Sequence, residues 1–359
     1  MLDLTGSLYL GLRHPSAELG DWDALTTGVP AALDRSGAVH SLAARLAELV
    51  GAEAGLLFRS SLHGFLDVFS SCPGEAVLVD AASYPVARWP LAGRRCAGGP
   101  VRTFPHRDPR GLARRLQLLH GGVRCRPLVV ADGFCTGCGR PAPVAGYLEV
   151  LRPYGGVLVL DDTQAVGVLG RDPGPRVPYG HGGGGTVRWA GVDGPVVQVD
   201  SLAKGFGAPL AVVAGPAALI ERIRAHGPTR VHSSAPSSAD LRAADRALAV
   251  NARSGERFRA RLLWLVRRFR RRLADRGVLL GHGDFPVQRL EPTDRQRASA
   301  MHAWLCSAGL RSLVTAPPCR PGAAVTVVLT AALSVPQVDR AADLLARAAQ
   351  GGVGRGNGS

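Results

Sequence analysis

Short apolar runs separated by helical patterns recur in this chain as far as about residue 215. Several of the runs are continuously apolar, which is typical of strands buried on both faces of a sheet. Because parallel strands are joined through crossover helices, this alternation predicts an α/β fold with a mainly parallel sheet covered on both faces. A helix is expected over 62–69, and strands are expected over 54–58, 76–80, 127–132, 156–161, 195–200 and 211–215.

The pattern changes after Pro236, which predicts a second domain. A long basic helix over about 239–276 comes first, with Leu262, Leu265 and Phe269 in its buried stripe and arginines on its solvated face. Shorter strands and helices follow as far as about residue 349. The expected organisation is listed in chain order: an N-terminal segment 1–30, a large domain 31–238, a small C-terminal α+β domain 239–350 and a disordered tail 351–359. Residues 100–108 and 171–194 are expected to be irregular.

Composition narrows the class of protein. Of the 359 residues, 46% are hydrophobic and 20% are charged, which is usual for soluble globular chains. No apolar run approaches the ~20 residues that span a bilayer, and the N-terminus lacks the layout of a signal peptide. The seven cysteines are an odd number and are few for this length, which suits reduced thiols. We therefore expect a cytoplasmic protein with no membrane partner.

Lys204 is the one lysine among 43 basic residues, so the other 42 are arginines. The net charge of +15 is compatible with nucleic-acid binding, but GC-rich coding also replaces lysine with arginine wherever a solvated charge is sufficient. Arginine stays protonated, whereas a desolvated lysine can lose its proton and attack a carbonyl. Lys204 is therefore a candidate nucleophile, and survival by chance is the alternative.

Four aspartates, Asp80, Asp132, Asp161 and Asp200, each end a predicted strand. In open α/β sheets, ligands bind beyond the carboxyl ends of the strands, so these side chains are candidates for a site. Lys204 follows Asp200 by four residues, and it is expected to face the same crevice as Asp161. A carboxylate at a strand end is also often a helix N-cap, and some of the four are expected to have that role.

Two of these segments resemble a known family. Residues 199–207, Val-Asp-Ser-Leu-Ala-Lys-Gly-Phe-Gly, resemble the lysine segment of fold-type I enzymes that depend on pyridoxal 5'-phosphate (PLP). Residues 160–170 resemble the Asp-Asp-Ala-His-Gly-x-Gly-Val-Leu-Gly segment of the α-oxoamine synthases, which belong to the class II aminotransferase family. Weaker matches at 8–12, 51–58 and 132–134 occur in the same order, so the resemblance covers residues 8 to about 236.

The resemblance implies a role for each matching residue around PLP. Lys204 would bond the cofactor and then move the α-proton of the substrate, and Asp161 would keep the pyridine nitrogen protonated. Tyr84 stands where the family stacks a histidine on the ring. Thr136 stands where a serine contacts the phenolic oxygen, and Gln164 replaces a histidine and can still donate a hydrogen bond there, but it cannot titrate.

The resemblance also implies a phosphate site at the start of the 62–69 helix, where backbone N–H groups and the helix dipole favour an anion. Its residues would be Ser60, Ser61 and Leu62. Ser201 would add a hydroxyl. Ser234, which follows another serine, resembles a residue that reaches the phosphate from the neighbouring subunit, and this implies a homodimer. Ordinary capping or turn roles are the alternative for these serines.

The largest departure from the family lies in the small domain. Where the family carries an arginine that holds the substrate carboxylate, this chain has Val325. A bidentate guanidinium contact cannot be replaced by valine. Either another arginine does this work, with Arg311 and Arg320 as nearby candidates, or the substrate is an ester, amide or carrier thioester without a free α-carboxylate.

The spacing of Cys135 and Cys138 fits zinc or redox chemistry, but no second pair of this kind occurs. Both cysteines also fall in the stretch that resembles the family's Asp-Gly-x-x-Ser segment. The sequence therefore gives no reason to expect a metal.

The resemblance implies condensation of an amino acid, or a derivative of one, with an acyl thioester, with loss of CO2. The positive surface would suit acyl-coenzyme A or an acyl-carrier protein. The alternative keeps PLP but changes the outcome, to an aminotransferase, racemase or lyase that acts on a derivative without a free carboxylate. A regulatory protein that binds nucleic acid on the same fold would rest on the charge alone, and no reader motif supports it, so no nucleic-acid partner is expected.

Overall fold

A computed structural model describes residues 1–71, 76–92, 101–120, 126–281 and 283–351, and its contacts divide the chain into two units. The larger unit comprises Leu12–Cys135 and Pro141–Gly255. The smaller unit comprises Met1–Gly11, Thr136–Arg140 and the chain from Glu256 onward. The expected domain boundary after residue 238 stays a prediction. The division between the two units falls after Gly255, within the helix Ser238–Ala274.

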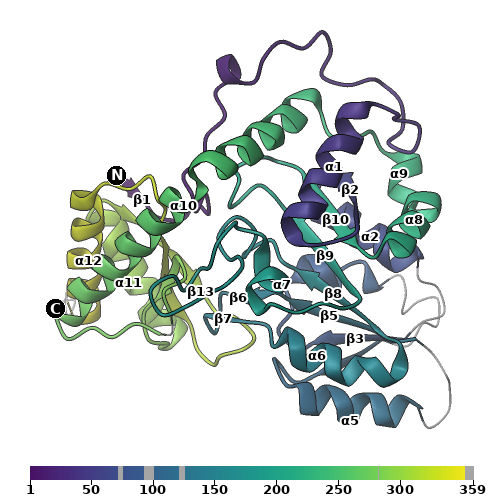
Figure 1. Cartoon of the computed structure of the whole chain (residues 1–359). Helices are drawn as coiled ribbons and strands as arrows, with labels where there is room; N and C mark the ends of the chain where they lie inside the picture. The colour runs from purple at the N-terminus through teal and green to yellow at the C-terminus, as the bar shows by residue number, and fades with distance from the viewer. Residues whose placement is uncertain (72–75, 93–100, 121–125, 282, 352–359) are drawn as a thin grey trace. The chain divides into compact units, whose positions relative to one another are not determined.

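The larger unit is built on a seven-stranded sheet in the order β2-β10-β9-β8-β5-β3-β4 (Figure 1). Strand β10 is antiparallel to both of its neighbours, and the other described pairs are parallel. The mainly parallel sheet is therefore confirmed. Its strands in chain order are β2 (Ala54–Phe58), β3 (Val77–Asp80), β4 (Val101–Phe104), β5 (Leu128–Asp132), β8 (Val157–Asp161), β9 (Val196–Ser201) and β10 (Ala211–Gly215).

Continuous apolar strands bury both faces of this sheet. In β8, Val157 and Val159 join one core cluster, whereas Leu158 and Leu160 join the other. This follows from the period of two in a strand, which sends successive side chains to opposite faces. The first cluster includes side chains from α2 (Ser61–Ser71), α3 (Pro85–Arg88) and α8 (Ala217–His226), and the second from α5 (Pro109–His120), α6 (Val144–Leu151) and α7 (Gly185–Ala190).

Four further helical elements are described in the larger unit. Helix α1 (Gly37–Val50) covers the β2 end of the second face, where Gly55 leaves room for its backbone. The short helix α9 (Pro228–His232) follows α8, and 3-10 turns lie at Ser16–Glu18 and Arg152–Tyr154.

Two stretches that were expected to be irregular contain regular structure. The first holds the edge strand β4, in which Val101 and Phe104 are buried around exposed Arg102 and Thr103. Two exposed residues between two buried ones do not alternate, so the period-two signal of a strand is absent. The second holds α7, which begins at the end of the glycine run. The tail expected to be disordered is 351–359, and of it residues 352–359 lie outside the described residues.

The smaller unit combines two small sheets with helices. The antiparallel sheet has the order β11-β14-β13, and a parallel pair joins β1 to β12. The strands are β1 (Leu2–Asp3), β11 (Val287–Arg289), β12 (Leu310–Arg311), β13 (Leu313–Thr315) and β14 (Ala324–Val328), and the helices are α11 (Arg295–Ser307) and α12 (Val335–Ala349). A capping box of Ser334 and Gln337 opens α12, which explains where that helix begins.

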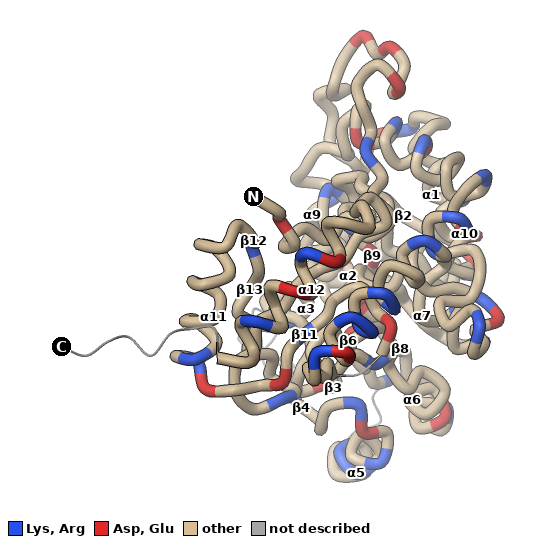
Figure 2. The backbone as a smooth tube through the Cα atoms, turned by 90° about the vertical axis from the view of Figure 1, so that its left-hand side faces the viewer, with Lys and Arg blue, Asp and Glu red and all other residues tan. Residues whose placement is uncertain are grey.

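Helix α10 (Ser238–Ala274) is the long basic helix expected from the sequence. Its predicted stripe is buried, as Leu262, Leu265 and Phe269 show. Its arginines are less solvated than expected, because Arg268 and Arg272 form paired hydrogen bonds to Asp339 and Asp343 of α12. Acidic and basic stretches are interspersed along the backbone (Figure 2). Among the described helices, none combines the length and the apolar character needed to cross a membrane.

Candidate active site

The carboxyl ends of β5 and β8 bring two carboxylates side by side in the larger unit. Asp132 and Asp161 are partners in the parallel register of these strands. Asp161 is 7% exposed, and its carboxylate accepts the N–H of Thr163 at 3.2 Å. Burial raises the pKa of Asp161, while the bonds from Thr163 and the charge of Lys204 act in the opposite direction.

Lys204 lies in the turn that follows β9 and is half-buried. Burial lowers the pKa of its amine, and the carboxylates of Asp161 and Asp132 partly offset that effect. The structure therefore brings the predicted pair into one electrostatic environment, on neighbouring strands of the sheet. A lowered pKa is what lets a lysine act as a nucleophile or base near neutral pH.

The glycines of the two matching segments explain how the segments approach each other. Gly167 has a φ of +86°, and a Cβ added there would lie 3.1 Å from the Cα of Gly205. A Cβ on Gly205 would in turn collide with the carbonyl oxygen of Val166. Thr163 adds a direct link, because its hydroxyl accepts the N–H of Ser201 at 3.0 Å. The Asp161 and Lys204 segments are thus held together backbone against backbone.

Asp132 has a larger place in the site than its weak motif indicated. Its carboxylate accepts the backbone N–H of Tyr84 at 2.9 Å. Burial, followed by the negative charge of Asp161, raises the pKa of Asp132 to about 8. The sequence marked Asp132 as one of four aspartates that end strands, but it did not show that the strand of Asp132 lies beside the strand of Asp161.

The other two strand-end aspartates behave differently. Asp80 does not cap a helix. Its carboxylate accepts the backbone N–H groups of Ala82 at 2.8 Å and Arg107 at 2.9 Å, and so stabilises two loops. It also bonds Nδ1 of His106 at 2.7 Å. Asp200 is fully buried, and neither of its carboxylate oxygens has a hydrogen-bond partner in the described part of the chain.

The predicted phosphate residues lie where the sequence places them, at the start of α2. Ser60, Ser61 and Leu62 are half-buried there, and the Ser60 hydroxyl lies 2.8 Å from Nδ1 of His63. The hydroxyl of Ser201 accepts the N–H of Ala203 at 3.4 Å, so it also has a local turn role. Ser234 forms an isolated bridge with Pro30.

The remaining predicted ligands are spread over the two units. Tyr84 is 56% exposed at the start of α3, which leaves its ring accessible. Gln164 is half-buried three residues after Asp161. Thr136 belongs by its contacts to the smaller unit.

The groups in the larger unit fit the chemistry of PLP. An amine suits the cofactor's aldehyde, a buried carboxylate suits its ring nitrogen, and the N–H groups that open α2 suit its phosphate. Two cavities of about 570 and 680 Å³ occur in the same unit, beside α1, and neither is lined by Lys204, Asp161 or Asp132.

In the smaller unit, Val325 occupies the position at which the family carries the arginine that binds the substrate carboxylate. Val325 is 1% exposed in the central strand β14. Arg311 is exposed and pairs with Asp3 at 3.2 Å. Arg320 instead lines a small cavity of about 20 Å³ together with Thr136 and Arg289, a residue that the sequence reasoning missed. Arg289 lies on β11, next to β14.

Known proteins resemble most of this chain. No protein-family model matches it. The 8-amino-7-oxononanoate synthase of Alkalilimnicola ehrlichii is 33% identical over 306 residues, which cover 84% of this chain and 74% of that enzyme. The enzyme of the same name from Halorhodospira halophila is 32% identical over 318 residues, or 87% of this chain and 75% of that enzyme.

Solved structures agree on the fold. The serine palmitoyltransferase of Sphingomonas wittichii superimposes with a TM-score of 0.80 at 22% identity, covering 97% of this chain and 87% of that one. The 8-amino-7-oxononanoate synthase of Francisella tularensis gives a TM-score of 0.71 at 15% identity, with 97% and 98% covered. At these identities the likeness concerns the fold.

Proposed function

This chain belongs to the PLP-dependent α-oxoamine synthase family, and we propose that it condenses an amino acid, or a derivative of one, with an acyl thioester and releases CO2. Its cofactor is PLP, and its fold is the fold-type I architecture expected from the sequence. The observation that carries the proposal is the pairing of half-buried Lys204, in the turn after β9, with buried Asp161 at the end of the neighbouring strand β8. The relatives carrying the name 8-amino-7-oxononanoate synthase support this branch of PLP chemistry.

When bound, PLP supplies an electron sink that stabilises negative charge at the α-carbon of an amino acid. Lys204 would hold the cofactor and then take the α-proton at Nζ, which its lowered pKa makes feasible near neutral pH. Asp161 would hold a proton on the ring nitrogen through its carboxylate. Burial and the charge of Asp161 raise the pKa of Asp132 to about 8, which favours its protonated form at neutral pH and would avoid a second negative charge next to Asp161.

The other predicted ligands complete the proposed cofactor site. The start of α2 would bind the phosphate through backbone N–H groups, with Ser201 adding a hydroxyl. Tyr84 would stack on the ring, with its backbone fixed by Asp132. Thr136 and Gln164 would hydrogen-bond the phenolic oxygen.

We assign the missing carboxylate contact to Arg320. Arg311 is engaged by Asp3 at an exposed edge, whereas Arg320 lines a cavity of the smaller unit that Thr136 also lines. A guanidinium in that position would bind a carboxylate of the amino-acid substrate. We further propose that the enzyme works in the cytoplasm as a homodimer, with Ser234 reaching the phosphate of the partner subunit, and with acyl-coenzyme A or an acyl-carrier protein as donor.

The single lysine makes a sharp test of this function possible. The purified protein with PLP should absorb in the visible region, and borohydride should abolish that band and fix the cofactor on the one lysine-containing peptide. Lys204→Ala should lack the band and lose about 10²–10⁴-fold in turnover, as expected when a positioned base is removed. Mass spectrometry of the peptides locates the reduced cofactor. The only other primary amine that could carry it is the N-terminus.

The reaction itself is tested by incubation with amino acids and acyl thioesters, with CO2 as the readout. Release of CO2 only when both substrates are present would support condensation. A keto-acid product without CO2 would favour the aminotransferase alternative, and a protein that stays colourless with added PLP would contradict both.

A further inference from the structure

The hairpin of β6 (Phe134–Cys135) and β7 (Arg140–Pro141) carries the run Cys-Thr-Gly-Cys-Gly at its tip. Gly139 has a φ of +68°, so the chain turns sharply just after Cys138. Two cysteines separated by two residues in a tight turn are the usual way in which a protein presents two thiolates to one zinc ion. The sequence shows no second pair of this kind, so further ligands must come from elsewhere in the chain.

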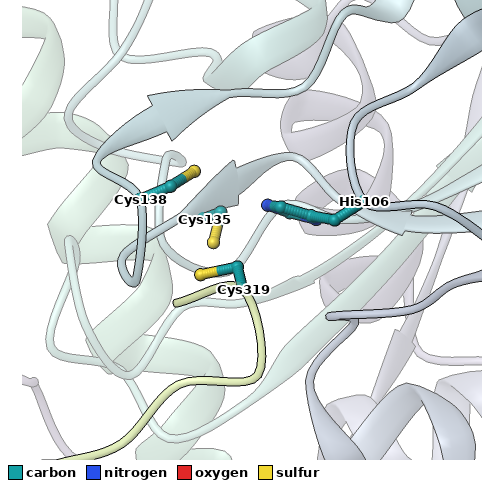
Figure 3. Close-up of side chains that lie close together, drawn as sticks. All are labelled: His106, Cys135, Cys138 and Cys319. Carbon is teal, nitrogen blue, oxygen red and sulfur yellow. The ribbon is translucent and has the colours of Figure 1, made fainter. Parts of the chain in front are cut away.

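In the larger unit, His106 supplies one of them. Its imidazole points toward Cys135, and its ligand nitrogen lies within 4.8 Å of the Cys135 Sγ (Figure 3). Nδ1 of the ring is bonded to the carboxylate of Asp80 at 2.7 Å, which orients Nε2 toward the cysteine. A histidine whose other nitrogen is held by a carboxylate is the arrangement that supports metal ligation, because the carboxylate fixes the ring and raises its basicity.

In the smaller unit, Cys319 lies beside Cys138, with the two Sγ atoms within 4.8 Å of each other. A Cβ added at Gly137 would come 2.5 Å from the Cys319 Sγ, so glycine is required between the hairpin cysteines for this sulfur to fit. The carbonyl of Gly137 accepts a bond from Nη1 of Arg289 at 2.7 Å, which fixes the tip of the hairpin.

The covalent chain joins these two pairs. Only Thr136 and Gly137 separate Cys135 from Cys138. Since each residue spans at most about 3.6 Å, the two thiols cannot lie far apart, and a Zn–S bond of about 2.3 Å lets both reach one ion.

We propose that Cys135, Cys138, Cys319 and Nε2 of His106 bind one structural zinc ion. Thiolates and imidazole select zinc over magnesium or calcium, and four protein ligands leave no open position for catalysis. Binding releases three thiol protons, so that Zn²⁺ with three thiolates and a neutral imidazole carries a net charge of −1. The ion would fix the hairpin that carries Thr136. The inference stands independently of the proposed reaction.

The test is the zinc content of the purified PLP-loaded enzyme, measured by mass spectrometry of the metal. The wild-type chain should carry about one zinc per chain, and Cys135→Ser, Cys138→Ser, Cys319→Ser and His106→Gln should each reduce it severalfold. Cys306→Ser is the matched control, because this thiol of α11 lies beside His302 and is no part of the proposed ligand set; it should retain the zinc.

A second readout needs no variant and so does not depend on whether the variants fold. Replacement of the ion by Co²⁺ in the wild-type enzyme should produce thiolate-to-cobalt charge-transfer absorption and tetrahedral bands. Zinc should also protect the three cysteines from alkylation, as read by peptide mapping. Wild-type enzyme without stoichiometric zinc, full zinc retention in Cys138→Ser, or a disulfide between Cys138 and Cys319 would each overturn the proposal.

Discussion

At the scale of single residues, burial changes what an ordinary charged side chain does. Lys204 and Asp161 would be unremarkable at the surface, but burial lowers the pKa of the amine and raises that of the carboxyl. Both shifts disfavour the charged forms, and each group opposes the shift of the other. Such a pair would offer PLP an amine that can lose its proton and react with the aldehyde, and a carboxyl group that can pair with the ring nitrogen.

Asp200 provides a prediction about stability. Burial, followed by the charges of Asp162 and Asp161, raises its pKa well above the ordinary value, and no bond compensates. A carboxyl whose pKa is higher in the folded state favours folding at low pH and loses that contribution as pH rises above about 4. Asp200→Asn should therefore gain stability over wild type with rising pH, by at most about 1.4 kcal/mol per pH unit.

Urea unfolding of both proteins from pH 4 to pH 8 measures this trend. Asp193→Asn, at an exposed position in the same unit, is the matched control. A difference between Asp200→Asn and wild type that is the same at every pH would contradict the prediction.

Arg320 provides a prediction about the substrate. If its guanidinium holds the carboxylate, Arg320→Ala should raise KM for the amino acid by about 10- to 100-fold, since a charged hydrogen bond contributes about 1.5–3 kcal/mol. The value of kcat should change less, and Arg311→Ala should leave both parameters near wild type because Arg311 pairs with Asp3. An unchanged KM in Arg320→Ala would favour a substrate without a free carboxylate.

At the scale of elements, backbone contact between two loops builds the site. The segments after β8 and β9 meet at Gly167 and Gly205, where there is no room for side chains. This explains in physical terms why glycines recur in both matching segments. The paired strands bring the carboxylate and the amine near each other, and the glycines let the loops close.

Gly205→Ala tests this contact. The added methyl group would collide with the carbonyl oxygen of Val166, a backbone atom that cannot rotate away. We expect a loss of about 1–3 kcal/mol in the free energy of unfolding, the usual cost of overpacking, together with weaker retention of the cofactor. Gly174→Ala, where the structure leaves open space and the backbone is unstrained, is the control for urea unfolding. Equal stability of the two variants would rule out a close-packed role for Gly205.

At the scale of the whole molecule, the net charge is +15, but some of the arginines form ion pairs within the fold. The arginines of α10 form two-pronged contacts with the aspartates of α12, such as Arg268 with Asp339 at 2.7 and 2.6 Å. These contacts give the basic residues of α10 a structural role that does not require nucleic acid. That the protein has no nucleic-acid partner stays a prediction.

A charge swap checks this use of the arginines. Arg268→Asp and Asp339→Arg should each lower the melting temperature, because each leaves two like charges facing one another. The double variant should recover part of the loss, and high salt should narrow all the differences. Additive losses in the double variant would show that the pair contributes no coupling.

The sequence alone indicated six of the seven strands of the large sheet and its mainly parallel character, and it singled out Lys204 and Asp161 as candidates. Strands buried on both faces are recognisable as continuous apolar runs, and Lys204 is recognisable because the other 42 basic residues are arginines. The edge strand β4 was missed because its middle residues are exposed. The partnership of Asp132 with Asp161, the role of Arg289 beside β14, and the approach of His106 to Cys135 depend on which strands and loops become neighbours. Those neighbours are separated by many residues along the chain, and only the tertiary structure brings them together.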